Sequence, residues 1–232
     1  MKQISYLTIP LLLNSYLNAD SSLALSYVKT TGNTDSTIFN AIGKTKQSID
    51  TTQWYDAKID AQYGKTNGNK DADKFIINAN YNKTISNALY YFIALNYKND
   101  KFSGYDYKAS IGPGLGYSVL KNDIQNLDLK LGVLYAKDKL ENGTSDSYAL
   151  GESELNYVHK LTDIVTISQN LKYSQSLENS KNYTATSQTG IRSKMTDKLS
   201  LGLSYTIDYT NLVPNGVEKA DKKFLTSLIV NF

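Results

Sequence analysis

Residues 105–119 read YDYKASIGPGLGYSV, and every large apolar side chain in this stretch falls at an odd position. Tyr107, Ile111, Leu115 and Val119 lie on one side of an extended chain, whereas the even positions carry aspartate, lysine, serine and glycine. Alternation with a period of two predicts a β-strand whose two faces meet different surroundings. The strand is also much longer than the about 5–6 residues that are usual in soluble sheets.

The same alternation recurs along the whole chain after residue 20. Clear strands are predicted over residues 55–63, 75–82, 89–97, 105–119, 127–135, 165–173, 199–209 and 224–232, and less regular ones over 22–30, 36–48, 146–159 and 183–194. Helical spacing and interdomain linkers are both missing from the pattern. We therefore predict one all-β domain, residues 20–232, folded as a closed antiparallel transmembrane β-barrel of about 12 strands.

The composition excludes several classes of protein. Because 25 Lys and Arg residues nearly balance 22 Asp and Glu residues, the net charge of +3 gives no reason to expect nucleic acid as a partner. The absence of cysteine excludes disulfide scaffolds, Cys-ligated zinc and thiol catalysis. A mean hydropathy of −0.40 excludes a bundle of membrane-spanning helices.

Residues 1–19 have the pattern of a secretory signal peptide. Lys2 gives a positive start, residues 4–13 are mostly apolar, and Leu17-Asn18-Ala19 resembles a cleavage site with small residues. The apolar run is shorter than the about 20 residues that a membrane-spanning helix needs. We predict that this signal peptide is removed on export.

Alternation does not say whether the apolar face looks inward, as in a soluble barrel, or outward, as in an outer-membrane barrel. Three observations favour the second. Tyrosines stand at the two ends of apolar stretches, as at Tyr55 and Tyr63, which suits the two membrane interfaces. The glycines of the polar face, Gly112, Gly114 and Gly116, suit a crowded lumen wall.

The third observation is an alternation between long polar loops and short turns. The long loops are predicted at 65–73, 98–104, 136–146, 175–182 and 210–222, and the short turns at 48–50, 84–87, 159–162 and 195–197. Short turns on one rim and long loops on the other are typical of a barrel inserted from the short-turn side. We therefore predict periplasmic turns, extracellular loops and a location in the cell outer membrane.

The last predicted strand ends in Phe232, behind alternating apolar residues. This pattern resembles the signal that outer-membrane barrels present to the barrel-assembly machinery, which we expect as a partner. We expect outer-membrane lipid and lipopolysaccharide as the surroundings, no nucleic acid, and a monomer. Pro113 cannot donate a hydrogen bond within its strand, so we expect a β-bulge there.

Several short segments, in order along the chain, carry a family resemblance. They are Thr30-Thr31-Gly32-Asn33-Thr34-Asp35, Tyr63-Gly64, Asp100-Lys101-Phe102-Ser103-Gly104-Tyr105-Asp106-Tyr107, Leu203-Ser204-Tyr205, and Val213-Pro214-Asn215-Gly216 with Glu218-Lys219. Through them the chain resembles an uncharacterised family named after salt-induced outer-membrane proteins. The resemblance implies an outer-membrane β-barrel and, from the name, salt-induced expression. It implies no cargo and no catalytic residue.

Any function of such a barrel is expected in its lumen. The polar parity of the strands predicts lumen-lining side chains at Asp56, Lys58, Asp60, Asp106, Lys108, Asp128, Lys130, Glu152, Glu154, Lys172, Arg192 and Asp208, with Lys44 and Lys46 added if strand 36–48 has the parity that we favour. Acids and bases nearly balance. The lumen is therefore either closed by its own paired charges or open to small polar solutes with weak charge selectivity. A count of twelve strands does not decide between the two.

The alternative function is an outer-membrane lipid hydrolase, which would need a serine activated by a histidine. The single histidine, His159, shares a face with Ser153, six residues or about 20 Å away along a strand and too far for a hydrogen bond. Glu152 and Glu154 form a close acid pair, which fits salt bridges to lysines as well as acid–base catalysis. We therefore expect no enzyme.

Metal and nucleotide sites are not expected either. The acidic segment 69–73 carries lysine beside its acids and lacks the spaced ligands of a calcium loop. The glycines of 112–116 lie inside a strand and precede no helix, unlike those of a phosphate-binding loop. The leading hypothesis is a narrow passive channel for small polar solutes, or a structural envelope component, without cofactor or metal.

Overall fold

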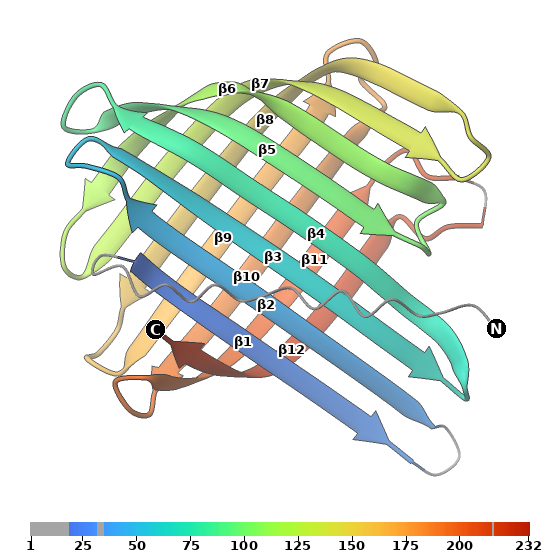
Figure 1. The fold of residues 1–232 in the computed structure, drawn as a ribbon, viewed down its shortest axis with the longest axis horizontal. Helices are drawn as coiled ribbons and strands as arrows, with labels where there is room; N and C mark the ends of the chain where they lie inside the picture. Colours follow the sequence, from blue (N-terminus) through green and yellow to red (C-terminus); the bar gives the residue numbers. More distant parts are fainter. Residues whose placement is uncertain (1–18, 32–34, 215) are drawn as a thin grey trace.

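The computed structural model describes residues 19–31, 35–214 and 216–232, and their regular structure consists of strands (Figure 1). The strands are β1 (Ala19–Thr30), β2 (Ser36–Ser48), β3 (Gln53–Thr66), β4 (Asn69–Thr84), β5 (Leu89–Asp100), β6 (Tyr105–Lys121), β7 (Gln125–Leu140), β8 (Ser145–Lys160), β9 (Val165–Ser176), β10 (Tyr183–Lys194), β11 (Leu199–Thr210) and β12 (Ala220–Asn231). The predicted signal peptide lies almost wholly outside the described residues, and its cleavage stays a prediction. No helix in the described part of the chain is long and apolar enough to cross a membrane.

The twelve strands form one closed barrel in which each strand pairs antiparallel with its neighbours in sequence. The barrel closes between β1 and β12, where Ser22 pairs with Asn231 and Leu25 with Leu228. β1 begins and β12 ends at the rim that carries the β2–β3 turn. The predicted fold is therefore confirmed.

Neighbouring positions along each strand have opposite surroundings, as the alternation predicts. On β7, Leu131 is 66% exposed and Val133 57% exposed, whereas Leu134 is 1% exposed and Ala136 2% exposed. The exposed set recurs on the other strands with Ile93, Ile111 and Leu115. Because these side chains share the outward parity, the outer surface of the barrel is a broad apolar band.

The connections on the far rim are shorter than predicted. Only Asn67 and Gly68 separate β3 from β4, and the ladder between β7 and β8 continues to Lys139↔Ser145. The predicted loops 65–73 and 136–146 are therefore mostly strand. Their polar residues on both faces hide the alternation, because a hairpin that projects beyond the apolar band meets water on each side.

The turns on the other rim share one local device. Asp50, Ser86, Asn122, Thr162 and Thr196 each accept a hydrogen bond at the side-chain oxygen from the backbone N–H of the residue three positions later. In the first turn the N–H of Thr52 also donates to the carboxylate at 2.7 Å, and this bond holds the pKa of Asp50 below its usual range. Such side-chain turns define hairpin geometry locally.

The bulge expected at Pro113 is absent, which corrects the sequence prediction. Ile93 pairs with Pro113, and the register with β7 is the same at Ile111↔Tyr135 as at Gly114↔Gly132. The two pairs between those positions are missing from the β6–β7 ladder. Pro113 therefore interrupts the pairing locally but does not shift the register of the strand. The register shifts of β6 lie near its ends, between Tyr105 and Tyr107 and between Ser118 and Leu120.

The glycines of β6 form a groove on its inner face. A Cβ at Gly114 would overlap the ring of Phe92, and one at Gly116 would overlap the ring of Tyr90. Both rings belong to β5 and are buried, with exposed fractions of 3% and 5%. The glycines are needed because two aromatic rings approach this part of the wall too closely to leave room for a Cβ.

We expect Gly114→Ala to lower the free energy of unfolding by about 1–3 kcal/mol, because the added methyl group displaces Phe92 from a packed position. Gly43→Ala is the matched control, since a Cβ there meets no atom within 4 Å. The measurement is the urea concentration at the midpoint of unfolding, with the mobility of unboiled protein on gels as the readout of folding. Equal midpoints for the two variants would contradict this account of the groove.

Candidate functional site

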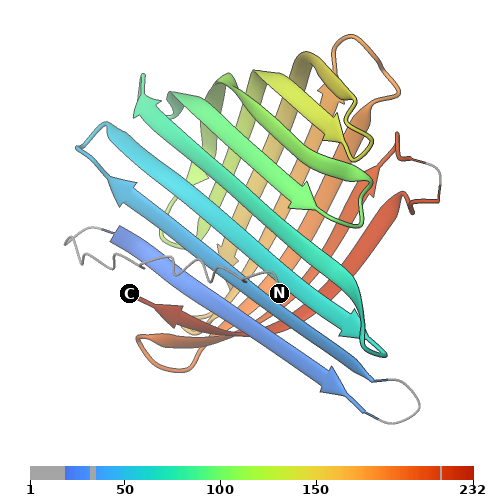
Figure 2. The ribbon, with the colours of Figure 1, turned by 45° about the vertical axis from the view of Figure 1, so that its right-hand side comes forward.

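A polar cavity of about 870 Å³ occupies the interior of the barrel. Its lining extends from Lys121 and Asn126 beside the β6–β7 turn to Asn182 and Thr210 at the opposite rim. Residues of all twelve strands contribute to it, and Figure 2 shows the closed arrangement of these strands. The cavity therefore reaches toward both ends of the barrel and is the candidate site.

The structure brings eleven of the twelve predicted lumen residues to this cavity. They are Asp56, Lys58, Asp60, Lys108, Asp128, Lys130, Glu152, Glu154, Lys172, Arg192 and Asp208, and both Lys44 and Lys46 join them. Asp106 does not line the cavity. Placement in the lining is a geometric result, and a role of these residues in transport stays a prediction.

Asp106 is displaced by an irregularity in β6. Tyr105 pairs with Leu140 and Tyr107 with Lys139, so Asp106 is an extra residue in a bulge. Its carboxylate contacts Lys139 Nζ at 3.0 Å, and the side chain is about half exposed. Because one extra residue reverses the parity of everything beyond it, the alternation read from the sequence fails at this point.

The prediction missed several charged residues of the lining. Lys74, Lys98, Asp138 and Lys223 all line the cavity, and each lies in or beside a segment that the sequence predicts as a loop. The sequence contains a signal that could have identified Lys74, because this residue has the same parity as the polar residues Asn78 and Asn80 of its strand. Asp20 and Lys121, at strand ends, were missed as well.

Aromatic side chains fill the space along one side of the barrel interior. The rings of Trp54 and Tyr90 lie 5.1 Å apart, and Lys130 Nζ stands 5.6 Å from the centroid of Phe92. The hydroxyl of Tyr90 donates to the carboxylate of Asp128. Tyr90, Phe92, Ala94 and Leu134 form a buried cluster inside the barrel. The open part of the lumen is therefore displaced away from this aromatic wall.

Most carboxylates of the cavity are held by bonded partners. Lys108 contacts Asp138 at 2.8 Å and Lys172 contacts Glu152 at 3.0 Å. Other acids accept from neutral donors instead. Asn80 and Asn82 each donate to Asp56 at 2.8 Å, and Asn170 donates to Glu154 at 2.6 Å. Hydrogen bonds of this kind fix a carboxylate and reduce its availability to a solute.

Several bases form no ion pair, although Arg192 donates a hydrogen bond to the side-chain amide oxygen of Asn231. Lys44 and Lys58 stand directly opposite each other on β2 and β3, an arrangement of like charges that destabilises a sheet. Arg192 adds a third positive charge near Lys44. Within the described ranges, no carboxylate lies within 4.0 Å of any of these three cationic groups. This group of three, the basic cluster, leaves positive charge available to a solute.

The whole lining carries a positive excess, which departs from the near balance read from the sequence. The eleven bases are Lys44, Lys46, Lys58, Lys74, Lys98, Lys108, Lys121, Lys130, Lys172, Arg192 and Lys223, and the eight acids are Asp20, Asp56, Asp60, Asp128, Asp138, Glu152, Glu154 and Asp208. Eleven less eight leaves a net charge of +3.

The residues considered for a hydrolase bond to other neighbours in the described part of the chain. In the part of the chain that is described, His159 Nδ1 shares a hydrogen bond with the hydroxyl of Tyr157 at 2.9 Å and bonds to no serine. Glu152 forms an ion pair with Lys172, and Glu154 accepts from Asn170 and lies near Lys130. The acid pair is therefore engaged with its neighbours. No cluster of three or more potential metal-ligating His, Asp or Glu side chains occurs among the described residues.

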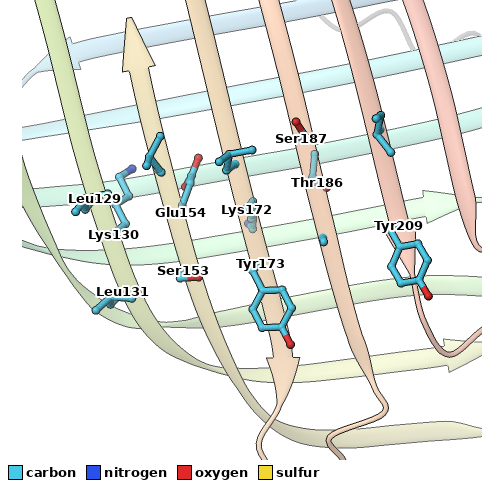
Figure 3. Close-up of a pocket in the computed structure, with 14 residues that line it drawn as sticks. Leu129, Lys130, Leu131, Ser153, Glu154, Lys172, Tyr173, Thr186, Ser187 and Tyr209 are labelled. Carbon is cyan, nitrogen blue, oxygen red and sulfur yellow. The ribbon is translucent and has the colours of Figure 1, made fainter.

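A second hollow of about 550 Å³ lies over β7 to β11 (Figure 3). Small residues such as Ser153 and Ser187 contribute to it beside the rings of Tyr173 and Tyr209. Most of its lining has the outward parity, and its charged members already belong to the central cavity. The central cavity therefore remains the candidate site.

A family model described as "Protein of unknown function, DUF481" matches residues 23–232. The chain belongs to this family. No curated protein matches the sequence. The DUF481 match agrees with the uncharacterised family expected from the sequence motifs, whereas the link to salt induction stays a prediction.

Three solved structures share the fold. The NanC porin is 8% identical with a TM-score of 0.56, covering 91% of this chain and 98% of its own. An outer membrane channel from Pseudomonas putida F1 is 8% identical with a TM-score of 0.57, covering 93% and 95%. The KdgM porin, solved in complex with disordered oligogalacturonate, is 6% identical with a TM-score of 0.52, covering 92% and 99%. This DUF481 chain therefore has the fold of outer-membrane porins and channels.

We expect Tyr148→Phe to lower the free energy of unfolding by about 1.5–3 kcal/mol, because it removes a hydrogen bond to a charged group. The Tyr148 hydroxyl donates to Asp138 at 3.0 Å in a buried position, beside the Lys108 ion pair. Tyr173→Phe is the control, because that hydroxyl bonds to Gln175 in an exposed position. Chemical denaturation in detergent measures both variants, and a loss as large in the control would refute the assignment.

Proposed function

We propose that the protein resides in the outer membrane and lets small polar solutes diffuse through its lumen, with a mild preference for anions. The observation that carries this proposal is the central cavity, whose charged and amide-rich lining extends between the two rims. A wall of mixed charge passes small polar solutes without strong discrimination, whereas a strongly selective pore has a ring of one sign.

The membrane location is supported by the outer surface. Large apolar side chains such as Leu115, Leu131 and Val133 are more than half exposed on the outward face. Soluble monomers rarely expose contiguous apolar patches larger than a few hundred Å². Strands of 12 to 17 residues are also long enough for the about 9–11 residues that cross a bilayer at a tilt.

The preference for anions follows from which charges are free. The carboxylates near the basic cluster are bonded, since Asp60 accepts from Asn40 at 2.7 Å and contacts Lys223 at 3.5 Å. Lys44, Lys58 and Arg192 keep their positive charge unpaired within the described residues. Because the lining also carries the net charge of +3, a small anion meets a favourable potential in the lumen.

The role is passive and not enzymatic in this proposal. Two of the three structural relatives are porins and the third is an outer membrane channel, which supports such a role. Lipopolysaccharide around the barrel and the barrel-assembly machinery at the last strand complete the proposed partners.

Planar-bilayer recording tests the proposal. We expect discrete conductance steps and a reversal potential, measured across a KCl gradient, that favours chloride. In Lys44→Gln/Lys58→Gln the preference for chloride falls by about twofold for each charge, since a charge ~10 Å away in water is worth ~0.4 kcal/mol.

Lys181→Gln/Lys198→Gln is the matched control. It removes the same charge from exposed positions outside the cavity lining, so the selectivity stays as in the parent protein. A barrel that inserts and never conducts would contradict the proposal and leave a structural envelope component. A preference for cations would contradict the anion assignment.

A further inference from the structure

The joint between β1 and β12 is the least complete in the barrel wall. β1 pairs with β2 from Ala19↔Gln47 to Thr30↔Ser36, and β12 pairs with β11 from Leu199↔Val230 to Tyr209↔Ala220. Between β1 and β12 themselves the ladder holds four pairs, from Ser22↔Asn231 to Leu25↔Leu228. Figures 1 and 2 both show the two strands separating beyond this point, toward the rim of the far connections.

The separation begins at one side-chain contact. If the register continued, Ser26 would face Ser227, and their hydroxyls do meet at 2.6 Å in a buried position. The next pairs in that register, Tyr27 with Thr226 and Val28 with Leu225, are missing from the ladder although these residues are all described. The Ser26–Ser227 contact is therefore the apex of a gap between two strand edges.

Unpaired strand edges are costly at membrane depth. Hydrocarbon offers no hydrogen bonds, and each unsatisfied backbone group there costs several kcal/mol. The gap is tolerated only where water, another molecule or a resumed ladder satisfies these groups. If the backbone groups of a strand edge can bond either to the neighbouring strand or to another molecule, the edge can exist in two states, one joined and one separated.

Large apolar side chains border the gap next to the polar contact at its apex. On the inward parity, Val28 is 51% exposed, whereas Leu225 is buried. On the outward parity, Tyr27 and Phe224 are each more than 60% exposed. Apolar groups therefore border the gap on both of its sides.

Side chains hold β12 across the inner side of the gap. Lys223 Nζ lies 3.5 Å from Asp60 Oδ2 and 3.5 Å from Gln62 Oε1, both on β3. Long, flexible contacts of this kind restrain two elements less firmly than a backbone ladder does. They also place a cation where the polar cavity meets the apolar border.

From these features we propose that the β1–β12 joint, the seam, is a lateral passage between the lumen and the surrounding lipid. It takes single-chain amphiphiles with an anionic head, because Lys223 and the basic cluster meet the head while the apolar border meets the chain. The seam opens as the strands separate beyond Ser26 and closes as the ladder resumes. This proposal rests on the proposed outer-membrane location, but it adds a second route that does not use the ends of the barrel.

A disulfide across the seam tests the passage, and the chain is suited to it because it has no cysteine of its own. Val28→Cys/Leu225→Cys joins positions that become opposite when the ladder resumes. Ala24→Cys/Ile229→Cys is the matched control. Ala24 and Ile229 pair four residues away from Val28 and Leu225 in the same register, within the part of the ladder that is formed. Both pairs therefore occupy the same kind of position in the alternation of hydrogen-bonded and non-hydrogen-bonded pairs.

The single tryptophan, Trp54, lines the cavity and reports arrival in the lumen. The reconstituted protein is exposed to 11-bromoundecanoate dissolved in the vesicle lipid and, separately, to aqueous iodide, both of which quench tryptophan fluorescence. Oxidised Val28→Cys/Leu225→Cys is expected to lose quenching by the brominated acid severalfold and to keep quenching by iodide. The reduced variant and the oxidised control behave as the parent protein does.

Each other outcome overturns a defined part of the account. Unchanged quenching by the brominated acid after the disulfide has formed would refute the lateral passage. Failure of Val28→Cys/Leu225→Cys to cross-link, while the control does, would refute a seam that closes. A disulfide between two chains would show that the edges pair with a second copy. If iodide does not quench Trp54 in the parent protein, the open lumen of the proposed function is contradicted instead.

Discussion

A backbone that crosses hydrocarbon has to bond every N–H and C=O group to the chain itself, and strands achieve this only by closing into a barrel. The rest of the structure depends on that constraint. Closure gives each strand an outer and an inner face, which is why side chains alternate along it. Closure also creates an interior whose polar groups must bond to one another or to water. The charged lumen and the apolar outer band are thus two results of one requirement.

The interior satisfies its polar groups unequally. Carboxylates such as Asp56 and Glu154 are held by asparagine amides, and Glu152 is held by a lysine. Lys44 and Lys58 face each other across a ladder pair. A wall selected for stability alone would avoid that arrangement, because like charges directly opposite each other weaken a sheet. The cost agrees with a role for the lumen that needs free positive charge.

Strand positions and the inner face could be predicted from the sequence because one face meets apolar surroundings and the other polar ones. The prediction fails where that contrast ends. Hairpins beyond the apolar band are polar on both faces, so Lys74 and Asp138 were lost in predicted loops. A one-residue bulge reverses parity without any signal in composition, so Asp106 was misplaced. The incomplete seam depends on how the first and last strands meet, and no local pattern encodes that.

The side-chain turns at Asp50, Ser86, Asn122, Thr162 and Thr196 have a consequence for how the chain assembles. Each specifies its own hairpin through contacts a few residues apart, so loop-closure entropy for these units is small. Joining β1 to β12 instead brings together Ser26 and Ser227, which are 201 residues apart. Contacts of such long range form slowly. Preformed hairpins therefore accumulate into an open, curved sheet, and joining its two edges is the slow last step.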